Sequence, residues 1–324
     1  MTVLVTGGAG YIGGRLTRRL LAHGEAVRIF DRETGAATRL ARMGADVFQG
    51  DILDRRAVTR AVQGCDRLFH VAAVFEMWLR DKKAYHQVNV EGTATVLEVA
   101  LEAGVRRVVH TSSAVTIGEK QGQEGHEETV HRGHFLSDYE RSKYLGERVA
   151  LEMCDRGLPL VCVNPTSVYG PGQTRHMTGA LIRFLNGRLP AVADSRLNFV
   201  YVDDVIEGHL LAMERGEVGQ RYILGGENAS LVRFLELAAE LAGVHRTART
   251  VPGWLLTVAA KSLGALSRLT GRRPLISADE ARTGLHSFTF DNRKARTELG
   301  LEFTPLREGL RRTVTWLREN ELIE

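Results

Sequence analysis

A glycine-rich run near the N-terminus constrains the fold of this chain more than any other sequence feature. The run, TGGAGYIG, spans Thr6 to Gly13, follows a strand-like segment at Val3 to Val5, and opens a helical pattern. In this setting Gly7 permits a tight turn, Gly10 lets the backbone approach a pyrophosphate at the helix N-terminus, and Gly13 lets the helix pack against the sheet. The run therefore predicts a dinucleotide site. The residues expected to cradle the pyrophosphate are Gly7, Gly10, Tyr11, Ile12 and Gly13.

The rest of the first half alternates β-branched runs with amphipathic helical patterns, which is typical of βα units around a parallel sheet. After Pro165 this alternation weakens. We therefore predict an α/β fold, with a Rossmann-type doubly wound parallel sheet over residues 1–163. A smaller, mainly substrate-binding C-terminal lobe is expected over residues 164–324, from which segments can return to the sheet. The strands are expected at Val3 to Val5, Val27 to Phe30, Asp46 to Phe48, Arg67 to Val71, Arg107 to His110 and Leu160 to Val163.

Acidic residues at the ends of the next two strands bear on which dinucleotide is bound. Asp31 stands 18 positions after Gly13, where a carboxylate can accept hydrogen bonds from both hydroxyls of an adenine ribose. Its charge would repel a 2′-phosphate, so NAD is favoured, although Arg32 beside it leaves NADP possible. Asp51 and Ile52 are expected beside the adenine, with the alternative that Asp51 caps the helix beginning near Asp54.

Charge and cysteine content exclude several other classes of protein. The net charge is +4, and the basic residues form no long runs, so nucleic acid is not indicated. The three cysteines show neither CxxC nor metal-type spacing, and their odd number favours a reducing cytoplasm. No metal site is expected, since a solvated or capping role is favoured for His126, His131 and His134. No apolar run is long enough for a membrane span, and Val251 to Leu269 is interpreted as an amphipathic helix on the protein.

A serine, a tyrosine and a lysine form the candidate catalytic set. Tyr139 and Lys143 lie four residues apart, on one face of an expected helix, and Ser113 directly follows a predicted buried strand. A free phenol, with a pKa near 10, is a poor proton shuttle at neutral pH unless nearby positive charge stabilises the phenolate. We therefore expect Tyr139 to be the acid/base, Lys143 its tuner and ribose anchor, and Ser113 the hydrogen-bond partner of the substrate oxygen.

These motifs together resemble the extended short-chain dehydrogenase/reductases. The resemblance covers essentially the whole chain and includes HVAA at His70 to Ala73, NVEG at Asn89 to Gly92, YERSK at Tyr139 to Lys143, and Asn164-Pro165. It implies that Asn89 lies near the nicotinamide ribose. It also implies a homodimer formed through the helices Ala84 to Leu101 and Tyr139 to Met153. The further cofactor contacts expected are Val71, Ala72, Ala73, Thr111, Tyr139, Lys143, Pro165 and Val168.

Two departures distinguish the chain from the nucleotide-sugar enzymes of this family. Ile117 stands where those enzymes usually have a tyrosine, and Leu197 stands where they have an arginine for the sugar-nucleotide diphosphate. Arg196 is a poor substitute, because neighbouring side chains on an extended segment face opposite ways. Several segments are more similar to the dihydroflavonol-4-reductase-like branch. The residues expected to contact substrate are Phe75, Trp78, Ser113 and Asn164.

The sequence thus favours an NAD(P)-dependent oxidoreductase that interconverts a ketone and a secondary alcohol on a largely apolar or aromatic small molecule. The alternative is an NAD-retaining nucleotide-sugar epimerase or dehydratase. A dinucleotide sensor without turnover is a third possibility, against which the intact Ser113, Tyr139 and Lys143 set argues.

Overall fold

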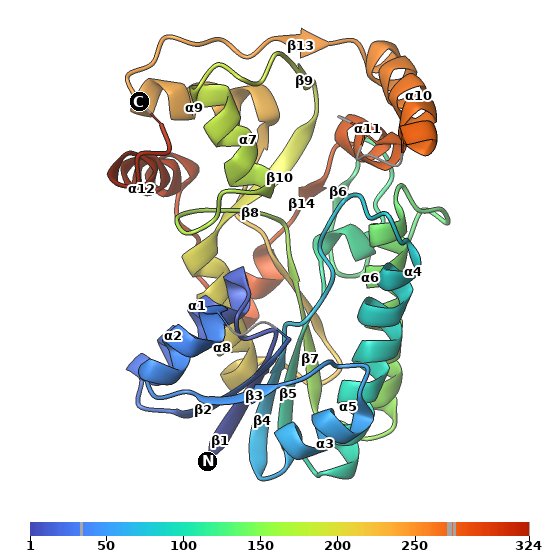
Figure 1. The fold of residues 1–324 in the computed structure, drawn as a ribbon, viewed down its shortest axis with the longest axis vertical. Helices are drawn as coiled ribbons and strands as arrows, with labels where there is room; N and C mark the ends of the chain where they lie inside the picture. Colours follow the sequence, from blue (N-terminus) through green and yellow to red (C-terminus); the bar gives the residue numbers. More distant parts are fainter. Residues whose placement is uncertain (33–34, 271–273, 275–276, 324) are drawn as a thin grey trace.

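The computed structural model describes residues 1–32, 35–270, 274 and 277–323. Its main feature is a sheet of seven parallel strands in the order β3-β2-β1-β4-β5-β7-β11 (Figure 1). The predicted doubly wound α/β sheet is confirmed, and each of the six expected strands is present. The strands are β1 Thr2–Thr6, β2 Ala26–Asp31, β3 Asp46–Gln49, β4 Cys65–His70, β5 Arg107–Thr111, β7 Leu160–Pro165 and β11 Arg221–Leu224.

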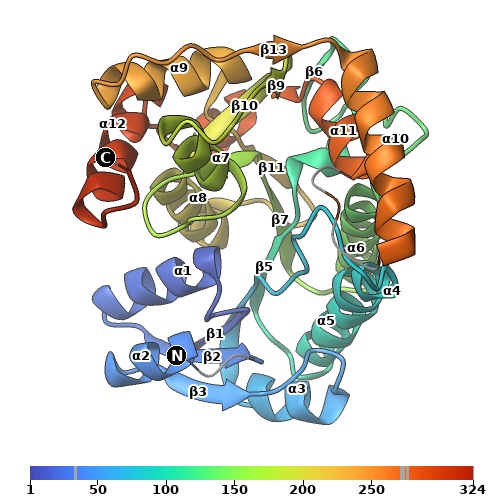
Figure 2. The same ribbon diagram turned by 45° about the horizontal axis from the view of Figure 1, so that its top comes forward.

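Helices cover both faces of this sheet, as Figures 1 and 2 show. One face carries α1 Tyr11–Ala22, α2 Gly35–Arg42 and α8 Val202–Arg215. The opposite face carries α3 Arg55–Val62, α5 Thr93–Glu102 and α6 Asp138–Asp155. Side chains alternate along each strand, so Val5 of β1 packs in the core beneath the first layer and Leu4 in the core beneath the second. Both faces are thereby buried, which explains the apolar character of the strands.

The helix expected at Ala84 to Leu101 is interrupted. It consists of α4 Lys83–His86, a π-helical segment η1 Gln87–Gly92, and then α5. Gly92 lies in close contact with Ile52, and a Cβ at this position would come within 2.5 Å of the Ile52 side chain. The wider π turn therefore sits where the helix passes the loop after β3, and π segments of this kind are frequent near functional sites.

A smaller lobe sits beyond the carboxyl ends of the strands (Figure 1). It contains a three-stranded sheet of β8 Ser167–Tyr169, β10 Arg196–Tyr201 and β12 Glu227–Ser230. Its core centres on Phe199 and Phe234, whose rings stack with centroids 4.2 Å apart. The surrounding helices are α7 His176–Leu185, α9 Leu231–Leu241, α10 Gly253–Thr270, α11 Ala278–Leu285 and α12 Leu306–Glu319.

Short elements join the lobe to the main sheet. The 3-10 helix η2 Ala114–Ile117 follows β5, and the π-helical η3 Ala295–Leu299 packs in the core beneath α8. Two parallel pairs complete the list: β6 Glu124–Gly125 with β14 Thr289–Phe290, and β9 Val192–Ala193 with β13 Thr250–Val251. Within the described part of the chain, no helix combines the length and apolar character needed to cross a bilayer.

Candidate active site

A cleft of about 380 Å³ opens at the carboxyl ends of the central strands. This is the edge at which open α/β sheets bind their ligands. The cleft gathers residues that the sequence places far apart, and all but three of the predicted site residues line it. The predicted residues in its lining are Gly7, Gly10, Tyr11, Ile12, Gly13, Asp31, Arg32, Asp51, Ile52, Val71, Ala72, Ala73, Phe75, Thr111, Ser113, Tyr139, Lys143, Pro165 and Val168.

The glycine loop forms the floor of one end of the cleft. Gly7 adopts a φ of +68°, and a Cβ there would lie 2.8 Å from the backbone nitrogen of Ala72. A Cβ on Gly13 would collide with the carbonyl oxygen of Gly7, so this glycine preserves the loop rather than the contact with the sheet. Close packing against the sheet falls instead to Gly8, whose Cβ would lie 2.7 Å from Ile29. The bare backbone beside the start of α1 suits the close approach of a pyrophosphate.

The carboxylates after β2 and β3 occupy the same end of the cleft. Asp31 accepts a hydrogen bond from the backbone nitrogen of Ala9 over 2.9 Å, which holds the carboxylate at the rim of the glycine loop. Arg32 lies 3.7 Å from the carboxylate of Asp51 and is largely exposed. The capping alternative for Asp51 is wrong, because Asp54 caps α3 by accepting from two backbone N–H groups. Asp51 lies in the cleft lining, and its carboxylate accepts from Leu53.

The serine, tyrosine and lysine converge at the other end. Ser113 follows β5 and is the N-cap residue of η2, while Tyr139 and Lys143 lie one turn apart on α6. The Ser113 hydroxyl lies close enough to the Tyr139 phenol to influence its pKa. Lys143 donates from Nζ to the carbonyl oxygen of Thr111 over 2.9 Å. All three side chains belong to buried residues, so their relative placement is fixed by packing on two elements.

Burial dominates the electrostatics of this set. It raises the pKa of Tyr139 above its ordinary value, and the nearby Ser113 hydroxyl acts in the opposite direction. Burial also lowers the pKa of Lys143 to about 8, against the raising influence of the Glu147 carboxylate. At neutral pH the phenol therefore carries its proton, and Lys143 is mostly an ammonium ion. Such a pair can donate a proton to a substrate oxygen and stabilise the phenolate that remains.

Two buried histidines beside the lysine are absent from the predicted site. His70 and His110 are adjacent in the sheet register, and their rings stack with centroids 5.3 Å apart. Burial lowers the pKa of His70 to about 3 and that of His110 well below its usual value, and the charge of Lys143 acts in the same direction. Both rings are neutral, so they add no positive charge next to Lys143. Two histidines at equivalent register positions of neighbouring strands are the sequence signal that could have identified them.

Three predicted site residues do not line the cleft. Asn89 is buried, and its amide exchanges hydrogen bonds with the backbone of Val74 and donates to Ser142 over 2.9 Å. It thus ties the loop after β4 to α6. Asn164 is fully buried and donates to Ser113, Thr116 and Glu147. Trp78 is half-buried in the loop after β4.

The end of the cleft that holds Tyr139 is mostly apolar. Phe75 meets Tyr139 edge-on and also contacts the ring of His176, 4.5 Å away between centroids. Val168 and Pro165 form part of the same lining. Among the lining residues that the structure describes, the cations are Arg32 at the Asp31 end and Lys143. Leu197 packs into the apolar cores of the lobe, and Arg196 is exposed on the opposite face of β10.

The histidines weighed as metal ligands have other surroundings. His131 packs against the rings of Phe135 and Tyr144, and the backbone of His126 donates to Thr129. Across residues 1–32, 35–270, 274 and 277–323, no group of three or more His, Cys, Asp or Glu side chains could hold a metal ion.

The chain is similar in sequence and in fold to known proteins. A sequence model described as the NAD dependent epimerase/dehydratase family matches residues 3–225. A protein of Synechocystis sp. whose assigned name includes dihydroflavonol 4-reductase is 36% identical over 99% of this chain and 95% of its own length. Sterol demethylase protein B of Methylococcus capsulatus is 35% identical over the full length of both chains. The crystal structure of gox2253 superposes with a TM-score of 0.87, at 32% identity, over 100% of this chain and 99% of that one.

Proposed function

The chain belongs to the NAD dependent epimerase/dehydratase family, within the extended short-chain dehydrogenase/reductases, and we propose that it interconverts a ketone and a secondary alcohol with NAD(P). One observation carries this proposal: Ser113, Tyr139 and Lys143 converge in the same cleft as the glycine loop. With its pyrophosphate on Gly7 and Gly10, a bound dinucleotide would extend along the floor of the cleft toward these three residues.

The three catalytic residues divide the work of carbonyl reduction. The nicotinamide, when bound, supplies the hydride. Tyr139 donates its phenolic proton to the substrate carbonyl oxygen, and Ser113 donates a hydrogen bond to the same oxygen as negative charge develops there. Lys143, held through Thr111, stabilises the phenolate left behind and binds the ribose hydroxyls. In the oxidative direction the phenolate accepts the proton of the alcohol.

An uncharged, largely apolar or aromatic substrate suits the catalytic end best. The wall is formed by Phe75, Val168 and Pro165, which favour apolar contact and aromatic stacking. In the described part of the cleft lining, no arginine lies near Tyr139, where a diphosphate would need one. Both relatives described above carry names that refer to ring compounds, an aromatic dihydroflavonol and an alicyclic sterol.

NAD is the preferred cofactor in this proposal. The carboxylate of Asp31 is held at the rim of the glycine loop by Ala9, where it can accept from the adenine ribose and repel a 2′-phosphate. Asp51 lies nearby in the lining, and we assign it to the adenine. We also assign α5 and α6 to a homodimer interface, and the protein to the cytoplasm.

An epimerase or dehydratase is the second candidate, because the family description includes both reactions. The two activities separate in one assay. Purified protein is tested with NADH and NADPH against a panel of aromatic and alicyclic ketones, and with NAD against nucleotide sugars. Net oxidation of NADH by the ketones supports the proposal. Isomerisation of a nucleotide sugar without net cofactor change would replace it with the epimerase. Tight NADH binding with no turnover in either panel would point to a sensor.

A further inference from the structure

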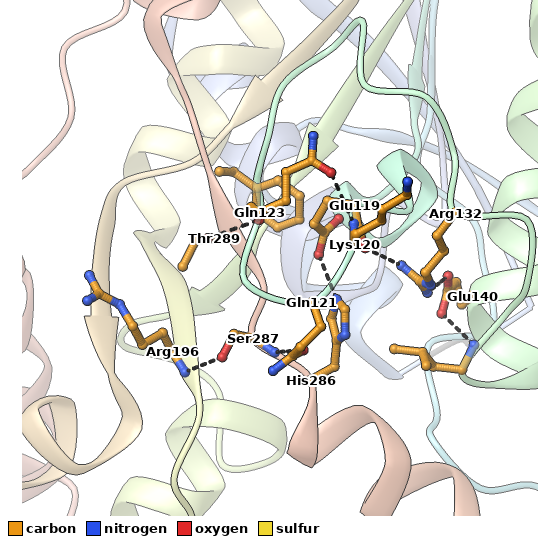
Figure 3. Close-up of polar contacts among 12 residues, drawn as sticks. Glu119, Lys120, Gln121, Gln123, Arg132, Glu140, Arg196, His286, Ser287 and Thr289 are labelled. Atoms are coloured by element: carbon orange, nitrogen blue, oxygen red, sulfur yellow. Dashed lines mark hydrogen bonds and ion pairs between the residues drawn. The ribbon is translucent and has the colours of Figure 1, made fainter.

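Arg132 is a buried arginine that joins the two elements carrying the catalytic hydroxyls. Its side chain is 3% exposed, although it lies in a loop between β6 and α6. Figure 3 shows it between Glu119 and Glu140. Nothing in the sequence marks this residue, since a charged residue in a polar loop normally faces solvent.

One set of its contacts holds the serine turn, defined here as residues 113–119. The backbone nitrogen of Arg132 donates to the carbonyl oxygen of Gly118 over 2.8 Å. Its guanidinium Nη1 donates to the carbonyl oxygen of Glu119 over 3.1 Å. Gly118 ends η2 in the left-handed conformation, with a φ of +65°, and Ser113 is the N-cap residue of that helix. Arg132 therefore binds the far end of the short turn that begins at Ser113.

The other contact holds the first turn of α6. The guanidinium Nη2 donates to the carboxylate of Glu140, the residue after Tyr139. Glu140 is itself buried and fixed, because its second oxygen accepts from the backbone nitrogen of Leu136 over 2.9 Å and its own backbone nitrogen donates to Ser137. The ion pair thus attaches Arg132 to the part of the helix that presents the phenol.

The serine turn is also attached to the smaller lobe. Nε2 of His286 lies 3.2 Å from a carboxylate oxygen of Glu119, and both side chains are buried. Two residues beyond the turn, Gln121 accepts from the backbone nitrogen of Ser287, and the Ser287 hydroxyl accepts from the backbone nitrogen of Arg196 on β10 (Figure 3). The serine turn is therefore held by Arg132 toward α6 and by His286 toward the smaller lobe.

We propose that Arg132, through Glu140, is a positioning residue that sets the spacing between the Ser113 and Tyr139 hydroxyls. The inference rests on the proposed function, because it assigns a role toward the same two groups. Replacing a buried ion pair by apolar residues is often neutral for stability, so stability alone does not explain this pair. Its contacts end on the two elements whose relative position the reaction requires, and small misplacements of reacting groups are costly.

The test compares a double variant, Arg132→Met with Glu140→Gln, to the unaltered protein. Both members are changed so that no buried charge is left unpaired. We expect kcat to fall roughly 10- to 100-fold, because the hydroxyls lose their fixed spacing. The Kd for NADH, measured by fluorescence titration, is expected to stay within about twofold, since Arg132 is not part of the described cleft lining. Arg132→Lys serves as a second test should the double variant fold poorly. It keeps the charge but loses the planar fork, so kcat should fall in the same direction by a smaller factor.

Arg107→Met provides the matched control. Arg107 is another partly buried arginine, at the opposite end of β5, where it donates to the carbonyl oxygens of Ala212 and Gly216. Its loss removes comparable contacts far from the cleft, so Tm should fall while kcat stays unchanged. Equal kcat losses in the control and in the double variant would overturn the proposal in favour of a general effect on stability.

A double-mutant cycle with Ser113→Ala supplies the deciding measurement. If Arg132 acts through the serine, the Arg132→Met and Glu140→Gln changes should lower kcat much less in Ser113→Ala than in the unaltered protein. Fully multiplicative losses, or an unchanged kcat in the double variant, would refute the positioning role. Failure of the proposed function is a different result: the unaltered protein would then show no net oxidation of NADH by ketones, or Tyr139→Phe and Ser113→Ala would retain ketone turnover themselves.

Discussion

The ring of Phe75 meets the ring of Tyr139 edge-on, with centroids 5.4 Å apart. The two residues come from different elements, the loop after β4 and the first turn of α6. Phe75 is 49% exposed even though it touches the buried ring of Tyr139, the proposed acid/base. The ring of Phe75 is exposed in the cleft and packs against Tyr139, so it is placed to contact a substrate bound there.

Phe75→Ala should therefore weaken substrate binding without changing cofactor binding. Loss of one aromatic contact is worth about 1 kcal/mol, so KM for an aromatic ketone should rise roughly 5-fold or more. A small aliphatic ketone should show little change. Steady-state kinetics with both ketones checks this, and Val218→Ala, which alters an exposed apolar side chain elsewhere, is the control. An equal effect on both ketones would contradict a substrate contact.

Tyr139→Phe should abolish most turnover. The variant keeps the ring and its packing but removes the transferable proton, so kcat should fall about 10²-fold to 10⁴-fold. The Kd for NADH should remain nearly unchanged. Tyr222→Phe is the control, because Tyr222 is also buried but its hydroxyl donates to Glu298, at η3. Near-normal activity of Tyr139→Phe with an intact fold would show that another group transfers the proton.

Gly13→Ala should damage the dinucleotide site, whereas Gly14→Ala should not. A Cβ on Gly13 would collide with the carbonyl oxygen of Gly7, while a Cβ on Gly14 would lie 3.4 Å from its nearest neighbour, an ordinary contact. The glycine loop must shift in the first variant, and we expect the Kd for NADH to rise about 10-fold or more, equivalent to about 1.4 kcal/mol. Similar Kd values for NADH in the two variants would mean that the glycine loop tolerates the shift.

Asp31→Asn should reduce the preference for NADH over NADPH. A hydrogen bond to a charged group contributes about 1.5 to 3 kcal/mol, so the affinity ratio should change by roughly 10-fold or more. Fluorescence titration with both cofactors measures this ratio. Asp46→Asn is the control, since Asp46 lies on the neighbouring strand and pairs with Arg28 outside the cleft. An unchanged ratio would remove Asp31 from cofactor discrimination.

The buried ammonium of Lys143 should make stability depend on pH. Its pKa is lowered to about 8 in the folded protein, against about 10.4 when unfolded, so between these values the unfolded chain binds more protons. The free energy of unfolding should therefore gain up to about 3 kcal/mol from this group as pH rises from about 8 to about 10.4. Urea unfolding of the protein and of Lys143→Met across this pH range isolates the contribution of Lys143 to the free energy of unfolding. A constant difference between the two proteins would contradict it.

Much of the architecture could be predicted, because glycine spacing and β-branched runs are local signals. Six of the seven strands of the main sheet, β1 to β5 and β7, and the helices α1 and α6 follow from them. The strand β11 was missed because Arg221–Leu224 is short and lies among irregular segments, so its place beside β7 depends on tertiary packing.

Side-chain direction explains the site residues that were misplaced or missed. Asn164 was expected at the substrate, but β7 is buried on both faces, so its pattern does not show which face meets the cleft. Trp78 lies in a loop without periodicity, and loops give no rule for direction. Nothing in the sequence marks Arg132 and Glu140 as a pair, and only the folded chain buries them together at the first turn of α6.

The return of β11 to the main sheet makes the order of synthesis matter. A nascent chain that ends before Arg221 holds β7 as an open edge, and every residue of that strand is buried in the finished protein. Unpaired apolar edges recruit other chains. Truncations that stop between the two strands should therefore aggregate, and interrupted translation in this interval would yield insoluble fragments rather than a dinucleotide-binding half.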